Sequence, residues 1–357
     1  MTADGHRPRG ARPLLLGTRK SKLAVAQAAW AAGRITAATG RAVRLVPLST
    51  EGDESSAPIE RFGSTGVFVT ALRRALLAGR VDFVVHSYKD LPTAPEAGLR
   101  LAAVPLREDP RDALAGPAGL PASLGALRPG ARVGTGSPRR AAQIRAHAPH
   151  VSVVPLRGNV DGRLARAASG ELDAVVLAMA GLSRLGRLRD VAAPLPTDVV
   201  LPAPGQGALA IECRAGDGAT AALLAAADDP PSHLAVAAER AFLSALNAGC
   251  TSPVGALAEH VRDGGSLRLD GLIAAPDGST ILRRGVTGPA ETAAGAAALG
   301  ARLARALLAD GGGDLLDVQR GEAADPRSRP TGPARTAYRS QPLNRGRHPR
   351  RPAGGPV

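Results

Sequence analysis

The chain has 357 residues, of which 44% are hydrophobic and only 2% aromatic, so two or three domains with aliphatic cores are expected. The formal net charge of +14 suggests nucleic-acid binding, but four Phe, one Trp and two Tyr are too few for base-stacking platforms. Two cysteines exclude a disulfide framework and fit a reducing compartment, and neither has a Cys or His partner at metal-ligand spacing. We therefore expect no metal site.

The first residues of the chain contain no apolar segment typical of a secretory signal. No apolar run approaches the ~18 residues that span a bilayer. We therefore expect a cytoplasmic protein without a membrane partner.

The N-terminal part of the chain alternates strand and helix patterns. Residues 13–27 predict a strand, a Gly-Thr turn and a helix capped by Ser21. The polar segment 51–66 is typical of a mobile loop, and the Pro- and Gly-rich stretch that begins with E-D-P-R-D-A resembles a linker. Further strands are expected at residues 43–48, 81–88 and 99–106, and a helix at residues 67–77.

The same order of elements repeats from residue 131. The run A-R-V-G-T-G-S-P-R-R predicts a strand, a second Gly-Thr turn and a helix with Ser137 at its N-cap and Pro138 at its first position. Strands are then expected at 151–156 and 173–177, and helices at 160–168 and from 178 through 185. Alternating strands and helices predict parallel sheets, so we expect two similarly built α/β domains that face each other across a ligand cleft.

After Gly205-Gln206-Gly207 the composition changes and a small α+β domain is expected. A helix at 235–246 stops at Asn247 and Gly249, and it presents Cys250 on the following loop. By itself, Cys250 fits a reachable thiol or a small residue packed under the turn equally well. Cys213 lies in the strand-like run A-L-A-I-E-C and is expected in a core. Strands at 257–261, 267–274 and 280–286 and a helix at 290–308 complete this domain.

Basic residues follow strands or open helices in both α/β domains, namely Arg19, Lys20, Arg139, Arg140, Arg157 and Arg163. A helix N-terminus with added arginines favours anions, so several at equivalent strand ends predict a polyanionic ligand. Taken singly, each is more typical of solvated surface. Lys89 and Asp90 follow an apolar strand and are expected in the same cleft, where cations would keep the carboxylate ionised. An Asp before Leu-Pro is otherwise a common turn residue, and His86 is expected to be packed or hydrogen-bonded.

Several motifs, in this order, resemble those of the porphobilinogen deaminase (hydroxymethylbilane synthase) family. They are G-T-R at 17–19, V-H-S-Y-K-D at 85–90, L-R-G-N-V at 156–160, L-P-A-P-G-Q-G at 201–207 and A-G-C at 248–250. The resemblance extends from about residue 14 to about residue 316. Each motif is short, and it is their shared order along the chain that makes the resemblance specific.

The expected fold class is α/β, with two periplasmic-binding-protein-like α/β domains around a cleft and a small α+β C-terminal domain. The resemblance implies that this third domain bears a covalently bound dipyrromethane cofactor. We expect a monomer. The expected domain boundaries are residues 13–107 with 205–227, residues 108–204, and residues 228–318. Residues 319–357 hold nine arginines against two acidic residues, a net charge of +7, and are expected to form a basic disordered tail.

The resemblance implies a transferase of tetrapyrrole biosynthesis that joins four porphobilinogen molecules head to tail, releases ammonia, and yields linear hydroxymethylbilane by hydrolysis. It implies that Cys250 holds one dipyrromethane cofactor per chain through a thioether, and that Asp90 is the catalytic carboxylate. Polar residues beside the cofactor would be Ser21, Ser137 and Gln206. The positions implied to bind the carboxylates of the cofactor and the growing oligopyrrole are Arg19, Lys89, Arg139, Arg140, Arg157, Arg163 and Arg184.

The sequence departs from the family pattern at three places. Ser64-Thr65 stands where Gly-Lys is usual, Lys22 stands where proline is common, and Gly136-Ser137-Pro138 replaces Ser-Ser-Leu.

Two other functions are compatible with parts of the pattern. Two α/β domains around an anion-binding cleft also describe solute-binding proteins, and a basic chain could bind nucleic acid, although the tail carries half of the net charge.

Overall fold

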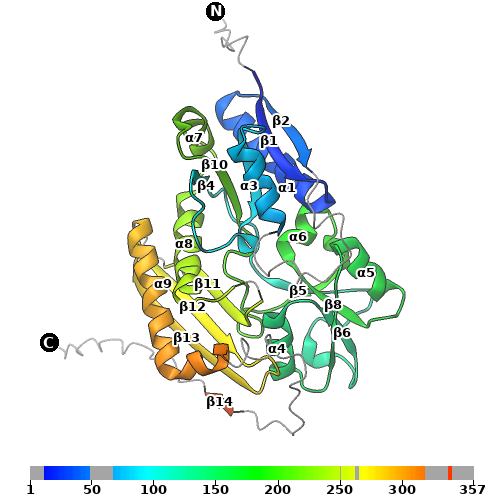
Figure 1. Ribbon diagram of the computed structural model, residues 1–357. Coiled ribbons are helices and arrows are strands. Elements are labelled where there is room, and N and C mark those ends of the chain that lie inside the picture. The colour runs from blue at the N-terminus through cyan, green and yellow to red at the C-terminus, as the bar shows by residue number, and fades with distance from the viewer. Residues whose placement is uncertain (1–11, 49–66, 250, 262–264, 318–336, 340–357) are drawn as a thin grey trace, which may run out of the picture.

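The computed structural model describes residues 12–48, 67–249, 251–261, 265–317 and 337–339. Three sheets with their helices form three units (Figure 1). The first unit is drawn in blue and cyan with β10 and α7 in green, the second in green, and the third in yellow and orange. The predicted mobile loop at 51–66 and Cys250 lie outside the described residues.

The first two units contain these elements: β1 (Leu14–Arg19), α1 (Lys22–Thr39), β2 (Val43–Leu48), α3 (Val67–Leu77), β3 (Phe83–Ser87), η2 (Tyr88–Asp90), β4 (Leu99–Ala103), β5 (Asp112–Ala115), η3 (Leu124–Ala126), β6 (Arg132–Thr135), α4 (Pro138–His147), β7 (Ser152–Pro155), α5 (Val160–Ala168), β8 (Ala174–Ala178), α6 (Met179–Arg184), η4 (Leu188–Asp190), β9 (Val191–Pro194), β10 (Leu209–Arg214) and α7 (Gly218–Ala225). The third unit contains α8 (Pro230–Ala245), β11 (Val254–His260), β12 (Ser266–Ala274), β13 (Thr280–Pro289), α9 (Ala293–Leu307), η5 (Leu308–Gly312) and β14 (Ala337–Arg339).

The first two sheets have the same strand order. The first is β2-β1-β3-β10-β4 and the second is β7-β6-β8-β5-β9, so each begins with three parallel strands. The fourth strand of each sheet, β10 or β5, runs antiparallel to both of its neighbours. Strand β5 is the first strand of the second unit along the chain, whereas β10 returns to the first unit after the chain has formed the second. The prediction of two similarly built α/β units is confirmed, but the prediction of wholly parallel sheets is wrong, because the chain crosses twice between the units.

The two predicted Gly-Thr turns are parts of strands instead. Gly17 lies inside β1 and Gly134 inside β6, which are equivalent strands of the two sheets. A Cβ atom on Gly17 would lie 3.0 Å from Cγ1 of Val84, and one on Gly134 would lie 2.6 Å from Cδ1 of Leu172. Glycine there leaves room for a closely packed neighbouring side chain and does not form a turn.

The stretch expected to be a linker contains the buried strand β5. Asp112, Ala113, Leu114 and Ala115 are all fully buried, and β5 lies between β8 and β9. The linker interpretation was wrong because its prolines and glycines flank a strand of only four residues. The segments that cross between the units are residues 104–111, which join β4 to β5, and residues 195–208, which join β9 to β10.

Predicted helix starts are confirmed at two positions that concern the site. Ser21 caps α1, where its Oγ accepts the N–H of Ala24 at 3.4 Å. Ser137 caps α4, where its Oγ accepts the N–H of Arg140 at 3.5 Å and Pro138 occupies the first helical position. Both caps place basic side chains in or beside the first turn of a helix.

In the third unit, helices α8 and α9 pack on each other and on the antiparallel strands β11, β12 and β13 (Figure 1). The core there consists of aliphatic side chains around Phe242, as the low aromatic content predicts. Within the predicted tail, residues 337–339 pair as the short parallel strand β14 with the edge of β13. In the described part of the chain, no helix has the length and apolar character needed to cross a membrane.

Candidate active site

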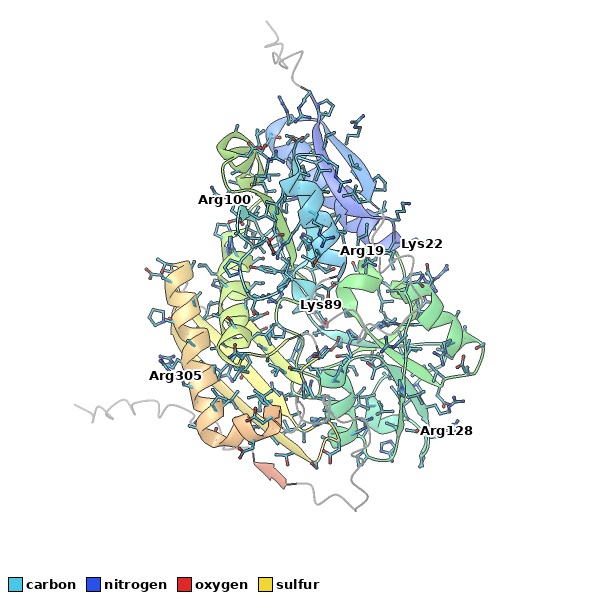
Figure 2. All side chains as sticks on the ribbon, in the orientation of Figure 1. Arg19, Lys22, Lys89, Arg100, Arg128 and Arg305 are labelled. Atoms are coloured by element: carbon cyan, nitrogen blue, oxygen red, sulfur yellow. The ribbon has the colours of Figure 1, made fainter. Side chains whose placement is uncertain are left out.

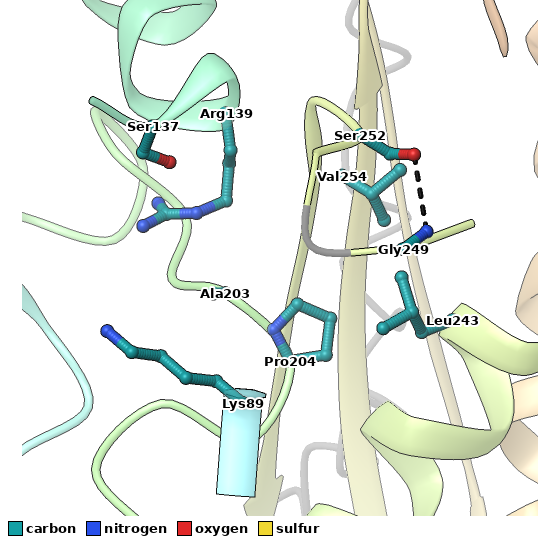
Figure 3. A pocket seen from close by; sticks show the side chains of 9 residues that line it. All are labelled: Lys89, Ser137, Arg139, Ala203, Pro204, Leu243, Gly249, Ser252 and Val254. Atoms are coloured by element: carbon teal, nitrogen blue, oxygen red, sulfur yellow. Dashed lines mark hydrogen bonds between the residues drawn. The ribbon is translucent and has the colours of Figure 1, made fainter. Parts of the chain in front are cut away.

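A pocket lies where the three units meet (Figure 3). The first unit contributes Lys89 from the turn after β3, and the second contributes Ser137 and Arg139 from the start of α4. The crossing segment contributes Ala203 and Pro204, and the third unit contributes Leu243, Gly249, Ser252 and Val254. The lining therefore combines two cationic residues and a hydroxyl group with residues from the end of α8 and the loop that follows it.

The two arginines that open α4 share one buried carboxylate. Nη2 of Arg139 lies 2.8 Å from Oδ2 of Asp112, and Nη2 of Arg140 lies 2.6 Å from Oδ1. Arg140 also donates Nε to Oδ1 at 2.9 Å and Nη1 to the carbonyl oxygen of Val176. Asp112 is fully buried, and both arginines are at least nine-tenths buried. The side chains are held rigidly because each guanidinium has a partner at a fixed position.

These charges perturb one another. Burial alone would raise the pKa of Asp112, but the guanidinium groups of Arg139 and Arg140 bring that pKa well below its usual range. Burial lowers the pKa of Lys89 to about 8, against the opposing effect of the neighbouring Asp90 carboxylate. A lysine with such a pKa loses part of its charge in mildly alkaline solution.

Gln206 connects the first and second units. Its side-chain nitrogen donates to the carbonyl oxygen of Pro110 at 2.7 Å and to Oδ1 of Asp112 at 2.8 Å. Its side-chain oxygen accepts from Nζ of Lys89 at 3.3 Å and from Nη2 of Arg140 at 3.4 Å. Gln206 is 1% exposed, so this predicted site residue is a buried bridge between the predicted cations.

The glycines that flank Gln206 explain the G-Q-G run. Gly205 and Gly207 have φ values of 78° and 87°, which L-residues with a Cβ rarely adopt. A Cβ on Gly207 would also lie 2.3 Å from the carbonyl oxygen of Glu108. The two glycines let the chain turn sharply, and this turn directs the Gln206 side chain into the junction.

Asp90 ends the 3-10 turn that follows β3, and its side chain is exposed. The sequence predicts that the cations surround Asp90, whereas Arg139 and Arg140 make their ion pairs with Asp112. Asp112 was missed because its segment resembled a linker. The available signal was a carboxylate directly before the apolar run of residues 113–115.

The remaining predicted cations lie at the ends of other elements and are not among the residues that line the pocket. Arg19 is half-buried at the end of β1 (Figure 2), and Arg157 is exposed after β7. Nε of Arg163 donates to the carbonyl oxygen of Gly158 at 2.8 Å, and Nη2 of Arg184 donates to that of Gly207 at 2.7 Å. Arg163 is nonetheless electrostatically coupled to the site, since burial and the like charge of Arg140 lower its pKa.

His86 is packed and paired, as predicted. Its Nε2 lies 3.2 Å from Oε2 of Glu212. Arg73 donates Nε to the same oxygen at 2.9 Å and Nη2 to Oε1 of Glu212 at 2.7 Å. Burial alone would raise the pKa of Glu212, but the hydrogen bonds from His86 and Arg73 lower it to about 2. This cluster joins β3, β10 and α3, and His86 lies two residues before the turn that carries Lys89 and Asp90.

Cys250 itself lies outside the described residues, but its neighbours in sequence are at the pocket. Gly249 and Ser252 both line it, and the N–H of Gly249 donates to Oγ of Ser252 at 3.3 Å (Figure 3). The other thiol, that of Cys213, is fully buried in β10, and burial raises its pKa. Cys213 is therefore the core residue that the sequence predicts.

Sequence reasoning also missed a buried ion pair that joins the crossing segments to the third unit. Arg107 donates Nη1 and Nη2 to the two carboxylate oxygens of Glu239 at 2.7 and 3.0 Å. Glu239 is 0% exposed and also accepts the N–H groups of Gly205 and Ala258 at 2.6 and 2.8 Å. No sequence motif pointed to this pair, because its members are far apart along the chain.

Two family models cover most of the chain. Residues 14–222 match the porphobilinogen deaminase, dipyromethane cofactor binding domain, and residues 233–309 match the porphobilinogen deaminase, C-terminal domain. The chain is 54% identical to porphobilinogen deaminase 1 of Streptomyces avermitilis, over 85% of this chain and 97% of that protein. It is 53% identical to porphobilinogen deaminase of Nocardia farcinica, over 85% of this chain and 88% of that protein.

Among solved structures, an ABC transporter periplasmic substrate-binding protein from Coxiella burnetii aligns with a TM-score of 0.39 and 15% identity. The alignment covers 61% of this chain and 92% of that one.

Proposed function

The chain belongs to the porphobilinogen deaminase family of tetrapyrrole biosynthesis, and we propose that the pocket between its three units is where porphobilinogen units are joined on a covalent dipyrromethane. The proposed reaction links four porphobilinogen molecules head to tail with release of ammonia, and hydrolysis then frees linear hydroxymethylbilane. Family membership replaces the solute-binding and nucleic-acid interpretations as the account of this site.

The observation that carries the proposal is the composition of the pocket. Lys89, Ser137 and Arg139 line the same pocket as Gly249 and Ser252, which flank Cys250 in sequence. A carboxylate-rich ligand attached at Cys250 would therefore begin beside two cations and a hydroxyl group. Bidentate arginine and an ammonium group are suited to bind carboxylates in such a position.

The residues fit the dipyrromethane in a second respect. Nε of Arg139 is buried and has no hydrogen-bond partner among the described residues. A buried guanidinium N–H without a partner is costly, so an acceptor from a bound carboxylate would stabilise it. We propose that Cys250 forms the thioether, that Ser137, Arg139, Arg140 and Lys89 hold the cofactor carboxylates, and that Ser21 and Gln206 are polar residues beside the cofactor.

Asp90 is proposed as the catalytic carboxylate. The cofactor, when bound, supplies the terminal pyrrole to which new rings are added. The Asp90 carboxylate would assist departure of ammonia, stabilise the cation that porphobilinogen then becomes, and accept the proton released after each addition. Its place in the 3-10 turn after β3, directly after Lys89, supports this role because both residues belong to a single short turn.

The outer arginines are proposed to bind the growing chain. Each added pyrrole brings two carboxylates, so successive intermediates need more cationic partners. Arg19, Arg157, Arg163 and Arg184 provide four cations at the ends of elements in the first two units. They are proposed to hold the oligopyrrole as it lengthens beyond the pocket.

Intact-mass measurement of the purified protein tests this proposal directly. Wild-type protein should exceed the mass of its sequence by one dipyrromethane, Cys213→Ser should keep the adduct, and Cys250→Ser should lose it. An adduct that remained in Cys250→Ser and disappeared in Cys213→Ser would overturn the assignment. Cofactor-loaded Asp90→Asn should consume porphobilinogen about 10²–10⁴-fold more slowly, as expected for loss of a general acid–base group.

We also propose that the enzyme is monomeric and cytoplasmic and has no nucleic-acid partner. Its domains are proposed to be residues 13–107 with 205–227, residues 108–204, and residues 228–318. Residues 319–357 are proposed to be a disordered tail that catalysis does not need, apart from the pairing of residues 337–339. A chain ending near Arg320 should keep its fold, cofactor and turnover, and loss of the cofactor or a marked fall in melting temperature would contradict this.

A further inference from the structure

The turn that carries Lys89 and Asp90 is held from two sides. On one side the N–H of Tyr88 donates to the carbonyl oxygen of Ala208 at 3.0 Å, and a Cβ on Gly205 would lie 3.3 Å from the backbone nitrogen of Lys89. The turn itself is closed by the N–H of Leu91, which donates to the carbonyl oxygen of Tyr88 at 3.1 Å. The G-Q-G segment therefore forms one wall of the turn.

Arg240 of α8 forms the other wall. Its Nη2 donates to the carbonyl oxygen of Leu91 at 2.6 Å, and its guanidinium carbon lies 5.4 Å from the centroid of the Tyr88 ring. These two partners immediately precede and follow the dipeptide Lys89–Asp90. Arg240 is only 8% exposed, so both contacts form in a largely water-excluded environment where they are strengthened.

The helix that carries Arg240 is itself fixed at this point. The preceding residue, Glu239, is fully buried and binds Arg107, Gly205 and Ala258 from three other segments. Ten residues after Arg240, the same chain reaches Cys250. Helix α8 thus contacts the turn that carries Asp90 through Arg240, and it ends at Ala245, just before the loop proposed to carry the cofactor.

We propose that Arg240 is a positioning residue that sets where Asp90 stands relative to the growing end of the chain attached at Cys250. This inference rests on the proposed roles of Asp90 and Cys250. Arg240 acts through the Leu91 carbonyl and the Tyr88 ring, and it does not itself bind substrate. A planar guanidinium can donate in its plane and stack on a ring at once, whereas a lysine ammonium can keep the charge and one hydrogen bond only.

The test compares Arg240→Met, Arg240→Lys and a matched control, Arg214→Met. Arg214 also donates to backbone carbonyls of the first unit, those of Leu76 and Val81, at the opposite end of β3. In cofactor-loaded Arg240→Met, kcat should fall by about ten- to a hundred-fold, since a misplacement of ~1 Å can cost about 10²-fold. KM should change less than about two-fold, Arg240→Lys should recover part of kcat, and Arg214→Met should keep wild-type kcat.

A measurement independent of activity separates this proposal from the proposed function. Hydrogen exchange of the amides in residues 88–91 should be faster in Arg240→Met than in wild type and unchanged in Arg214→Met. If wild-type protein neither carries an adduct nor consumes porphobilinogen, the proposed function fails and the exchange result still reports whether Arg240 holds the turn. Unchanged exchange and an unchanged kcat per loaded enzyme in Arg240→Met would overturn the positioning role, as would a fall in kcat equal in Arg214→Met.

Discussion

Asp112 and Arg140 form a buried ion pair in which Oδ1 lies 2.6 Å from Nη2. The pair joins β5, the strand that enters the second unit, to the first turn of α4, and Gln206 from the other crossing segment also donates to the carboxylate. Both crossings between the α/β units therefore meet at one carboxylate. This geometry makes Asp112 a support for the arginines of the site, and several expectations follow from it.

Asp112→Ala should strongly destabilise the protein. The substitution leaves Arg139 and Arg140 buried without their carboxylate, and breaking a buried pair in this way typically costs about 3–5 kcal/mol. Urea unfolding of wild type and variant measures the loss. Glu171→Ala, which removes an exposed partner of Arg166 in the same unit, serves as the control and should change stability little. Equal losses of stability in the two variants would mean that the buried ion pair stabilises the protein no more than an exposed one.

The charge on Lys89 should give the enzyme an alkaline limit. Burial lowers the pKa of Lys89 to about 8, so its ammonium is complete well below pH 8 and is lost as the pH rises through that value. If this cation binds carboxylates, kcat/KM should fall above about pH 8. Lys89→Arg keeps its charge throughout and should move the limit to higher pH. If the fall in kcat/KM stays near pH 8 in Lys89→Arg, the titrating group is not Lys89.

Arginines at different places should act at different stages. Arg139 lines the pocket beside the Cys250 loop, whereas Arg19 lies at the end of β1 and outside that lining. Arg139→Leu should impair cofactor loading or the first addition, and Arg19→Leu should load cofactor but bind or elongate poorly. Intact mass after brief exposure to porphobilinogen counts the rings on each variant. Arg305→Leu, an exposed change on α9, is the control (Figure 2). Normal loading and elongation in both variants would contradict the anion-binding site.

An exposed ion pair between the first two units should make their contact salt-dependent. Nζ of Lys22, in the first turn of α1, lies 3.0 Å from Oδ2 of Asp161 in α5, and Arg187 holds the other oxygen at 2.7 Å. Such pairs are weak and are screened by salt. Helix α6 of the second unit packs against α1, so its amides report on the contact between the units. At low ionic strength, Lys22→Ala should speed hydrogen exchange in α6 by a few-fold at most, and the difference should vanish near 0.5 M salt.

The matched control for this effect is Arg128→Ala. Arg128 and Asp173 form a pair within the second unit at 2.8 Å, and their side chains are about as exposed as those of Lys22 and Asp161. This variant should leave exchange in α6 unchanged at both salt concentrations. If the two variants behave alike, the Lys22–Asp161 pair does not contribute to the contact between the units.

Sequence patterns predicted most of the helices and strands because those elements depend on local periodicity and caps. Ser21 and Ser137 cap helices where predicted, and α5 has the predicted bounds. The elements that were predicted wrongly are short or have sequences compatible with more than one structure. The strand β5 has four residues between prolines and glycines, and Gly17 and Gly134 have the same letters in a strand as in a turn. Only the neighbouring Val84 and Leu172 show why glycine stands there.

The sequence by itself determined the residue types of the site and their order, because each lies in a short motif next to a strand or helix end. Lys89, Asp90 and Arg139 were found in this way, whereas Gln206 was implied by the family resemblance. Only the tertiary structure decided which of them touch, because contacts across 28 to 149 residues depend on how the chain crosses between the units. It placed Asp112 between the arginines, joined Glu239 to Arg107, and set Arg240 against the turn of Asp90. No sequence motif marks these partners, since each contributes a single charged side chain. Whether that side chain forms an ion pair or a hydrogen bond depends on which residues the fold places next to it.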